Sequence, residues 1–158
     1  MEDRRFFDHL GFDFVSIIRA FKNNLGNHPI QGASTIEQQL VRTLIDERKI
    51  CYNRKLTEIG LATLISNKFK KKEIMEYYLN SIPFKNCIGI NELCINDSYN
   101  INFLNIYEVS EIVGRIKYPS ISNNNYLRYL KRVRTTQIKL EFQNCEIQRA
   151  LLPNKAFC

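Results

Sequence analysis

The apolar residues of the chain recur mainly at the spacing of amphipathic helices. In the segment 13–24, Phe14, Ile17, Ile18 and Phe21 lie three or four residues apart and therefore share one helical face. Similar patterns predict further helices over 35–45, 53–68, 71–81, 106–117 and 126–142. The alternation of apolar and polar residues that is typical of strands is scarce. The pattern therefore predicts a mainly α fold without internal repeats.

Three of these helices are predicted from short apolar stripes. The stripes are Ile36, Leu40 and Leu44 for 35–45, Leu56, Ile59 and Leu64 for 53–68, and Ile74, Tyr77 and Tyr78 for 71–81. Two pairs have the spacing of a capping box at a helix start, Ser34 with Glu37 and Asn105 with Glu108.

Two segments have the composition of loops. Residues 25–34, LGNHPIQGAS, gather Gly, Pro and small polar residues, which favour turns. Residues 83–105 mix Gly and Asn with short apolar runs, so loops or at most a small hairpin are expected there.

Composition adds a positive charge to this picture. At 158 residues, of which 44% are hydrophobic, the chain suits one globular domain. The formal net charge of +7 favours an anionic partner, and charge alone leaves nucleic acid, acidic lipid and a phosphorylated substrate open. No stretch approaches the roughly 20 apolar residues that cross a bilayer, and no signal-like apolar run follows Met1.

Cysteine and histidine usage gives no metal-binding pattern. The five cysteines are odd in number, widely separated and include no CxxC pair, so neither a zinc site nor a disulfide framework is expected. His9 and His28 have no cysteine or second histidine at ligand spacing, so no metal held by imidazoles is expected.

The N-terminal segment is the first candidate for chemistry. Glu2 and Asp3 adjoin Arg4 and Arg5. One interpretation is a charged arm with ordinary surface ion pairs. The other is a carboxylate in a cationic cleft, where Glu2 can act as a general base on a sugar hydroxyl.

Two further polar clusters follow. The first surrounds a predicted helix N-terminus, where free N–H groups and the helix dipole suit an anion, although Ser34 can also simply cap the helix. The second is basic and ends in an acidic residue, Glu58, which lies one helical turn after Arg54 (i, i+4). It is either a solvated ion-pair face or a site for a pyrophosphate. The first contains Gln31, Ser34, Thr35, Gln38 and Gln39, and the second contains Arg42, Arg48, Lys49, Arg54, Lys55 and Glu58.

In their order and spacing, these clusters resemble the motifs of glycosyltransferase family 51, the peptidoglycan glycosyltransferases. Glu-Asp-x-x-Phe-x-x-His-x-Gly-x-Asp is matched by Glu2, Asp3, Phe6, His9, Gly11 and Asp13. Gln-Gly-Gly-Ser-Thr-Ile-Thr-Gln-Gln-Leu-x-Lys is matched by Gln31, Gly32, Ser34, Thr35, Ile36, Gln38, Gln39 and Leu40. Arg-Lys-x-x-Glu is matched by Arg54, Lys55 and Glu58, and Lys-x-Glu-Ile-Leu-x-x-Tyr-Leu-Asn by Lys71 or Lys72, Glu73, Ile74, Tyr78, Leu79 and Asn80. A late stretch matches more loosely through Leu104, Glu108, Pro119 and Ser120.

The resemblance implies a lysozyme-like bilobal helical domain that polymerises lipid II into glycan strands and releases undecaprenyl diphosphate. Glu2 would be the base that takes the proton of the acceptor 4-hydroxyl, and Glu58 would position the donor diphosphate. The leaving group would be stabilised by Arg42, Arg54 and Lys55, an electrostatic contribution that usually dominates such catalysis. The remaining substrate contacts would come from Asp3, Phe6, His9, Gln31, Ser34, Thr35, Gln38 and Gln39.

The resemblance also implies partners and a location. The one cofactor to consider is a divalent cation, Mg²⁺ or Mn²⁺, bound with the donor diphosphate. The partners would be lipid II, the growing glycan strand, the membrane surface and cell-wall synthesis proteins, without nucleic acid, at the outer face of the bacterial cytoplasmic membrane. Anionic lipid is expected to attract the basic residues Lys68, Lys70, Lys71 and Lys72.

The chain departs from the family in places. Ala33 replaces the second Gly of the second motif, Arg42 its Lys, and Glu37 its Thr, which adds a negative charge unless Glu37 turns back to cap its own helix. The segment 82–103 has drifted. Because the family carries a membrane anchor and jaw near this domain while Glu2 is the second residue, we expect an N-terminally shortened transglycosylase domain over 1–158, without a transpeptidase region.

Two other hypotheses stay open. A catalytically silent relic would keep the fold and bind lipid-linked glycan or a cell-wall partner; the drifted segment favours it, whereas the retained Glu2 and Glu58 favour the enzyme. A lysozyme-like hydrolase would use paired carboxylates and needs no diphosphate site, so the basic cluster around Arg54 argues against it.

Overall fold

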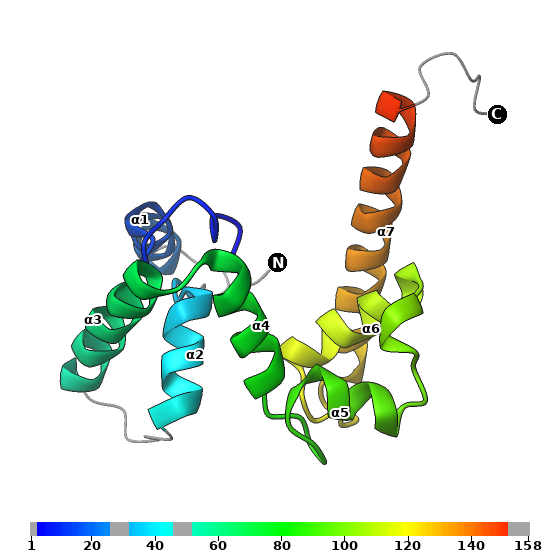
Figure 1. Ribbon diagram of the computed structural model, residues 1–158, viewed down its shortest axis with the longest axis horizontal. Helices are drawn as coiled ribbons and strands as arrows, with labels where there is room; N and C mark the ends of the chain where they lie inside the picture. Colours follow the sequence, from blue (N-terminus) through cyan, green and yellow to red (C-terminus); the bar gives the residue numbers. More distant parts are fainter. Residues whose placement is uncertain (1–2, 26–31, 46–51, 152–158) are drawn as a thin grey trace. The chain divides into compact units, whose positions relative to one another are not determined.

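The computed structural model describes residues 3–25, 32–45 and 52–151, and this part of the chain confirms the mainly α fold (Figure 1). The chain divides into two compact units, Met1–Ile82 and Pro83–Cys158, and each is described by itself. The described elements are α1 (Phe14–Asn24), α2 (Ile36–Ile45), α3 (Tyr52–Lys68), α4 (Lys71–Ser81), α5 (Gly89–Asn96), the short 3₁₀ helix η1 (Ile101–Phe103), α6 (Ile106–Lys117) and α7 (Tyr126–Leu151).

In the first unit, α2 packs against both α3 and α4. Its stripe is buried at Ile36 and Leu40, whereas Leu44 near its end is exposed. In α4, Ile74 and Tyr78 are buried, whereas Tyr77 is 54% exposed. The predicted stripes of α2 and α4 are therefore confirmed in part: their buried residues supply apolar contacts between these helices.

The predicted stripe of α3 is not its buried face. Leu56 and Leu64 are 69% and 64% exposed, whereas Ala62 and Glu58, one helical turn apart, are 0% and 1% exposed. The face that meets α2 is thus defined by a small residue and a carboxylate. Burial of the Glu58 carboxylate depends on cationic side chains at neighbouring positions. The spacing of apolar residues does not reveal such cations.

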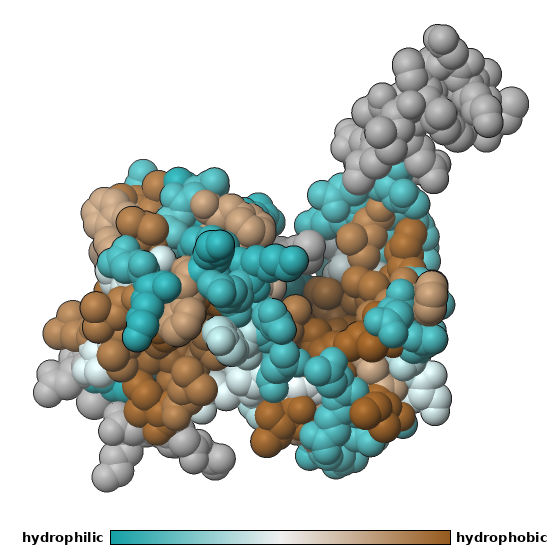
Figure 2. All heavy atoms as spheres, viewed as in Figure 1, coloured by the Kyte–Doolittle hydropathy of each residue, from teal (hydrophilic) through white to brown (hydrophobic). Residues whose placement is uncertain are grey.

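Helix α1 begins where the Asp13 side chain accepts a hydrogen bond from the Ser16 amide, at 3.2 Å. Its apolar stripe faces solvent, since Phe14 and Phe21 are about two-thirds exposed, and Ala20 is the one buried residue among its described side chains. Apolar residues accordingly gather at the surface over α1, at the upper left of Figure 2. The described part of the chain does not cover this face.

The second unit is built around α6 and α7, which pack closely. A Cβ on Gly114 would lie 2.8 Å from Val133 Cγ2 and 2.9 Å from Tyr129 Cε2, so the two helices approach at a distance that a larger residue would prevent. The predicted capping box of Asn105 and Glu108 is confirmed at the start of α6.

The prediction of loops or a small hairpin for 83–105 is wrong over the range of α5. Leu93 and Cys94 are buried, and the Glu92 carboxylate accepts a hydrogen bond from the Ile88 amide at the helix start, at 2.9 Å. Asn91 and Asn96, which indicated turns, lie on the exposed face of this short helix. One isolated bridge, Pro83 with Ile88, is the only pairing of extended backbone among the described residues.

Helix α7 is longer than predicted, reaching Leu151 rather than ending near 142. The predicted end of the helix was the end of its apolar stripe. The sequence has no helix-breaking residue from there to Pro153, so the helix can continue beyond the stripe. Although α7 has 26 residues, it is rich in Arg and Lys. No described helix combines the length and the apolar composition needed to cross a membrane.

Replacing Gly11 with Ala should destabilise the first unit by more than about 2 kcal/mol. Gly11 has φ +88°, and a Cβ there would lie 2.5 Å from the backbone carbon and oxygen of Ala62. Urea unfolding measures the loss. Gly60→Ala is the matched control: Gly60 lies in α3 with no atom within 4 Å of the added Cβ, so stability should be unchanged or rise by up to about 1 kcal/mol. Equal effects of the two substitutions would show that Gly11 is not a close contact.

Candidate active site

The segment before α1 is fastened to the start of α2 through Asp3. Its Oδ2 accepts the Ile36 amide at 3.2 Å and lies 3.0 Å from His9 Nε2, while Oδ1 accepts the Arg5 amide at 3.2 Å. Asp3 and His9 side chains are 4% and 7% exposed. These predicted residues therefore hold backbone in place. Glu2, the predicted base, precedes Asp3 directly and lies outside the described residues, as does Gln31.

Thr35, not Ser34, caps α2. The Thr35 hydroxyl donates to the Gly11 carbonyl at 2.7 Å and accepts from the Gln38 amide at 3.3 Å. The Gln38 side chain also donates to the Gly11 carbonyl, at 3.3 Å. The predicted capping box of Ser34 and Glu37 is wrong, because the Glu37 carboxylate turns into the protein instead of back to its own helix end.

The strongest concentration of charge surrounds Glu58. Arg42 donates to both Glu58 oxygens, from Nε at 3.0 Å and from Nη2 at 3.1 Å. Arg54 Nε lies 3.3 Å from Oε1, which confirms the predicted i, i+4 pair, and Lys55 Nζ lies 3.4 Å from Oε2. Lys55 also donates to Gln38 Oε1 at 2.6 Å and to Ser34 Oγ at 3.1 Å. We call these six residues the Glu58 cluster: Ser34, Gln38, Arg42, Arg54, Lys55 and Glu58.

Burial and charge act in opposite directions on this cluster. Burial alone raises the pKa of Glu58, but the hydrogen bonds and charges of Arg42 and Lys55 outweigh it and hold that pKa below its ordinary value. Burial lowers the pKa of Lys55, against the opposing effect of Glu58. The Arg42 and Lys55 side chains are 43% and 42% exposed, so both cations are accessible to an anion from solvent while the carboxylate beneath them is not.

A second cluster was not predicted. Glu37 is fully buried and forms an ion pair with Lys71 Nζ at 2.5 Å, and Ser66 Oγ lies 3.2 Å from the same oxygen. Asp3, His9 and Glu37 each place one potential metal-ligating atom within 4.8 Å of the others. We call Asp3, His9, Glu37, Ser66 and Lys71 the Glu37 cluster. The fourth motif contained Lys71, but no local sequence signal paired it with Glu37, 34 positions earlier.

The other predicted residues are more peripheral to these clusters. Phe6 is 2% exposed and lies beneath Lys71, whose Nζ is 4.6 Å from the ring centroid. Gln39 accepts a hydrogen bond from the Tyr78 hydroxyl at 3.0 Å, away from the contacts of Glu58. Lys71 is engaged in this way, whereas Lys68, Lys70 and Lys72 are exposed. The attraction of these basic residues to lipid stays a prediction.

Neither cluster offers a ready site for a divalent cation. Both Glu58 oxygens face cationic groups, which would repel Mg²⁺ or Mn²⁺. In the Glu37 cluster, the Lys71 ammonium already supplies a positive charge, and both Asp3 oxygens accept backbone amides. The donor set of these residues therefore does not fit a metal.

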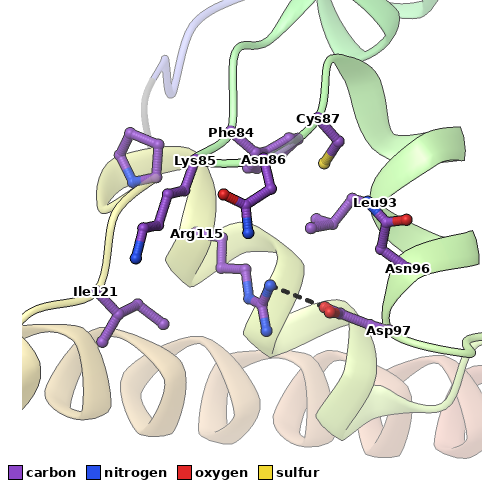
Figure 3. Close-up of a pocket in the computed structure, with 10 residues that line it drawn as sticks. Phe84, Lys85, Asn86, Cys87, Leu93, Asn96, Asp97, Arg115 and Ile121 are labelled. Carbon is purple, nitrogen blue, oxygen red and sulfur yellow. Dashed lines mark ion pairs between the residues drawn. The ribbon is translucent and has the colours of Figure 1, made fainter.

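The second unit contains a separate cavity of about 190 Å³, shown in Figure 3. Lys85, Asn86, Asn96 and the ion pair of Arg115 with Asp97, 2.8 Å apart, supply its polar lining. None of the predicted site residues lines it. All of those that the structure describes lie in the first unit.

The Glu58 cluster makes stability depend on pH. Folding lowers the pKa of Glu58, so the ionised carboxylate stabilises the fold at pH values above the ordinary pKa of 4.5. This contribution is lost as the pH falls through the lower pKa of the folded state. Glu58→Gln should cost at least about 2 kcal/mol at pH 7, and its difference from the unmodified chain should shrink below pH 4.5. Chemical denaturation across pH measures this. Glu76→Gln, at an exposed carboxylate, should have little effect, and a pH-independent loss for Glu58→Gln would contradict the ionic origin.

Comparison with known proteins agrees with this arrangement. A family model described as Transglycosylase matches residues 1–140. Penicillin-binding protein 4 of Bacillus subtilis (strain 168) is 46% identical over 86 residues, 54% of this chain and 14% of that protein. A monofunctional glycosyltransferase of Staphylococcus aureus (strain JH9) is 28% identical over 159 residues, 91% of this chain and 58% of that protein. The chain thus spans less than two thirds of the length of either relative. Since the family match takes in most of the chain, including both clusters, the chain belongs to the transglycosylase family.

Proposed function

We propose that the chain is a peptidoglycan glycosyltransferase that polymerises lipid II into glycan strands and releases undecaprenyl diphosphate. The observation that carries the proposal is the Glu58 cluster, in which Arg42, Arg54 and Lys55 converge on one buried carboxylate. Guanidinium groups and an ammonium held side by side suit the oxygens of a diphosphate. Membership of the transglycosylase family supports the same reaction class.

In the proposed reaction, the 4-hydroxyl oxygen of the acceptor sugar attacks the anomeric carbon of the donor. Glu2 takes the hydroxyl proton, and the bond from the anomeric carbon to the diphosphate oxygen breaks. The leaving diphosphate carries the developing negative charge, which Arg42 and Lys55 stabilise because their charged ends are already positioned. Glu58 keeps its charge throughout and orients these cations, because its pKa is lowered.

A divalent cation with the donor diphosphate stays a prediction. The residues around Glu58 do not fit such an ion, since cationic groups face both of its oxygens. In our proposal, these cations supply the charge compensation, and no step depends on a metal bound to Glu58.

The hydrolase alternative is less well supported. A glycosidase needs one carboxylic acid with a raised pKa to protonate its leaving group. The pKa of Glu58 is lowered instead, and its oxygens are engaged by cations. The silent relic differs from the enzyme only in lacking turnover, so the Glu2 experiment below separates the two.

We further propose that the first unit acts at a membrane surface, on the outer face of the cytoplasmic membrane, where a glycan strand for the wall is needed. The solvent-facing stripe of α1 supports this, since Phe14, Ile18 and Phe21 are 65%, 42% and 66% exposed. Arg19 and Lys22 lie on the same helix. An apolar face beside basic residues is typical of helices that lie in a membrane interface.

Glu2→Gln should reduce polymerisation of lipid II by about 10²–10⁴-fold, because it removes the proton acceptor while keeping the size of the side chain. Gel analysis of labelled lipid II measures the product. Asp8→Asn is the matched control, since it removes an exposed carboxylate from the same segment and should leave turnover unchanged. Unchanged turnover by Glu2→Gln would refute the assigned base, and absence of polymer from the unmodified chain would favour the silent relic.

The paired substitution Phe14→Ser and Phe21→Ser should weaken binding to vesicles of phosphatidylglycerol at least about tenfold, because both rings lose a favourable transfer into lipid. Sedimentation with vesicles measures the bound fraction. Part of the binding of the unmodified chain should persist at high salt, which screens only the electrostatic contribution. Phe142→Ser, at a 64% exposed position of α7, is the control. Equal binding by all three proteins would exclude α1 as the contact.

A further inference from the structure

Lys71 contacts side chains from two other parts of the first unit. Its Nζ pairs with the buried carboxylate of Glu37 on α2, at 2.5 Å, and lies 4.6 Å from the centroid of the Phe6 ring in the segment before α1. Lys71 itself is the first residue of α4, and its side chain is only 19% exposed. One ammonium group therefore joins α4, α2 and the N-terminal segment.

The carboxylate that holds this ammonium is a departure of this chain. The resembled second motif has a threonine where Glu37 stands, and a threonine cannot form an ion pair. Glu37 has no exposed surface, and burying a carboxylate is costly without a compensating cation. The pairing with Lys71 therefore constrains where the start of α4 can lie relative to α2.

The N-terminal segment is fixed at the same place. Phe6 is 2% exposed beneath the ammonium, and a desolvated cation over an aromatic ring is attractive. Asp3 and His9 lie beside Glu37, with potential ligand atoms of all three within 4.8 Å. Asp3 in turn holds the Ile36 amide, at the first turn of α2. The segment that carries Asp3 and Phe6 is thus held between Lys71 and the start of α2.

We propose that Lys71, charge-compensated by Glu37, is a positioning residue that fixes segment 3–13 on α2, the segment that the proposed base Glu2 directly precedes in the sequence. This inference rests on the proposed function for its catalytic consequence. Lys71 need not touch the substrate: it acts through Phe6 and through the surroundings of Asp3. In the Glu37 cluster, the cation is the ammonium group of Lys71. The carboxylates of Asp3 and Glu37 therefore need no metal ion to hold them.

The test compares Lys71→Met, Glu37→Thr and the double variant with the unmodified chain. Each single substitution leaves one charge buried without its partner, so a loss of stability there is uninformative about positioning. The double variant removes both charges and should regain most of the stability. It still lacks the ammonium over Phe6. Lys71→Arg keeps the charge and should retain the properties of the unmodified chain.

The first readout is amide hydrogen exchange, which needs no activity. The reporters are the amides of Arg5, Asp8 and Ile36, which donate to Asp3 Oδ1, the Arg5 carbonyl and Asp3 Oδ2. In the double variant their exchange should accelerate about tenfold or more, while the amides of α6 stay unchanged. Lys72→Met removes an exposed charge from the same helix and should leave these amides protected.

The second readout is polymerisation of lipid II by the double variant. The value of kcat should fall by about 10²-fold while KM changes little, because misplacing a catalytic group by about 1 Å has that effect without removing a substrate contact. The proposal would be overturned if the three amides of the double variant are as protected, and its kcat is as high, as in the unmodified chain. If the unmodified chain makes no polymer, the proposed function fails, and hydrogen exchange alone then decides whether Lys71 fixes the segment.

Discussion

Glu58 imposes the strongest constraint on the first unit. Its side chain is 1% exposed, yet its pKa is lowered, so it is buried in the ionised form. Such a charge is tolerated only where cations and hydrogen bonds replace water. Arg42 from α2 and Arg54 and Lys55 from α3 do so. The contacts of Arg42 with Glu58 and of Lys55 with Gln38 thereby fix how these two helices face one another. The structural requirement of the carboxylate and the proposed binding of a diphosphate depend on the same three side chains.

The first unit uses this device twice. Glu37 on α2 is buried and compensated by Lys71 of α4, as Glu58 on α3 is compensated by Arg42 of α2. The two differ in what remains accessible. Around Glu58, the side chains of Arg42 and Lys55 are each about two-fifths exposed, so an anion can reach them. Around Glu37 the ammonium is covered and rests on Phe6, which suits a structural role.

Helix positions followed from the sequence because caps and apolar stripes are local. The bounds of α1 and α4 were predicted to within one residue. The pairing of Arg54 with Glu58 was predicted as well. The buried face of α3 was not predicted, because the cations that permit burial of Glu58 come partly from α2. The same reason hid the pairing of Glu37 with Lys71, and α5 was missed because its exposed asparagines resemble those of a loop. Motif order located the Glu58 cluster, while Glu2 and Gln31 lie outside the described residues.

Calorimetric titration with farnesyl diphosphate, a soluble prenyl diphosphate, tests most directly whether Glu58 organises the cations for an anion. Glu58→Gln makes the site more positive but leaves Arg42, Arg54 and Lys55 without the group that orients them. Charge alone predicts that this variant binds the diphosphate more tightly. We predict weaker binding, at a temperature where the variant is folded, because the cations lose their preorganised positions. Equal or tighter binding by Glu58→Gln would contradict this prediction.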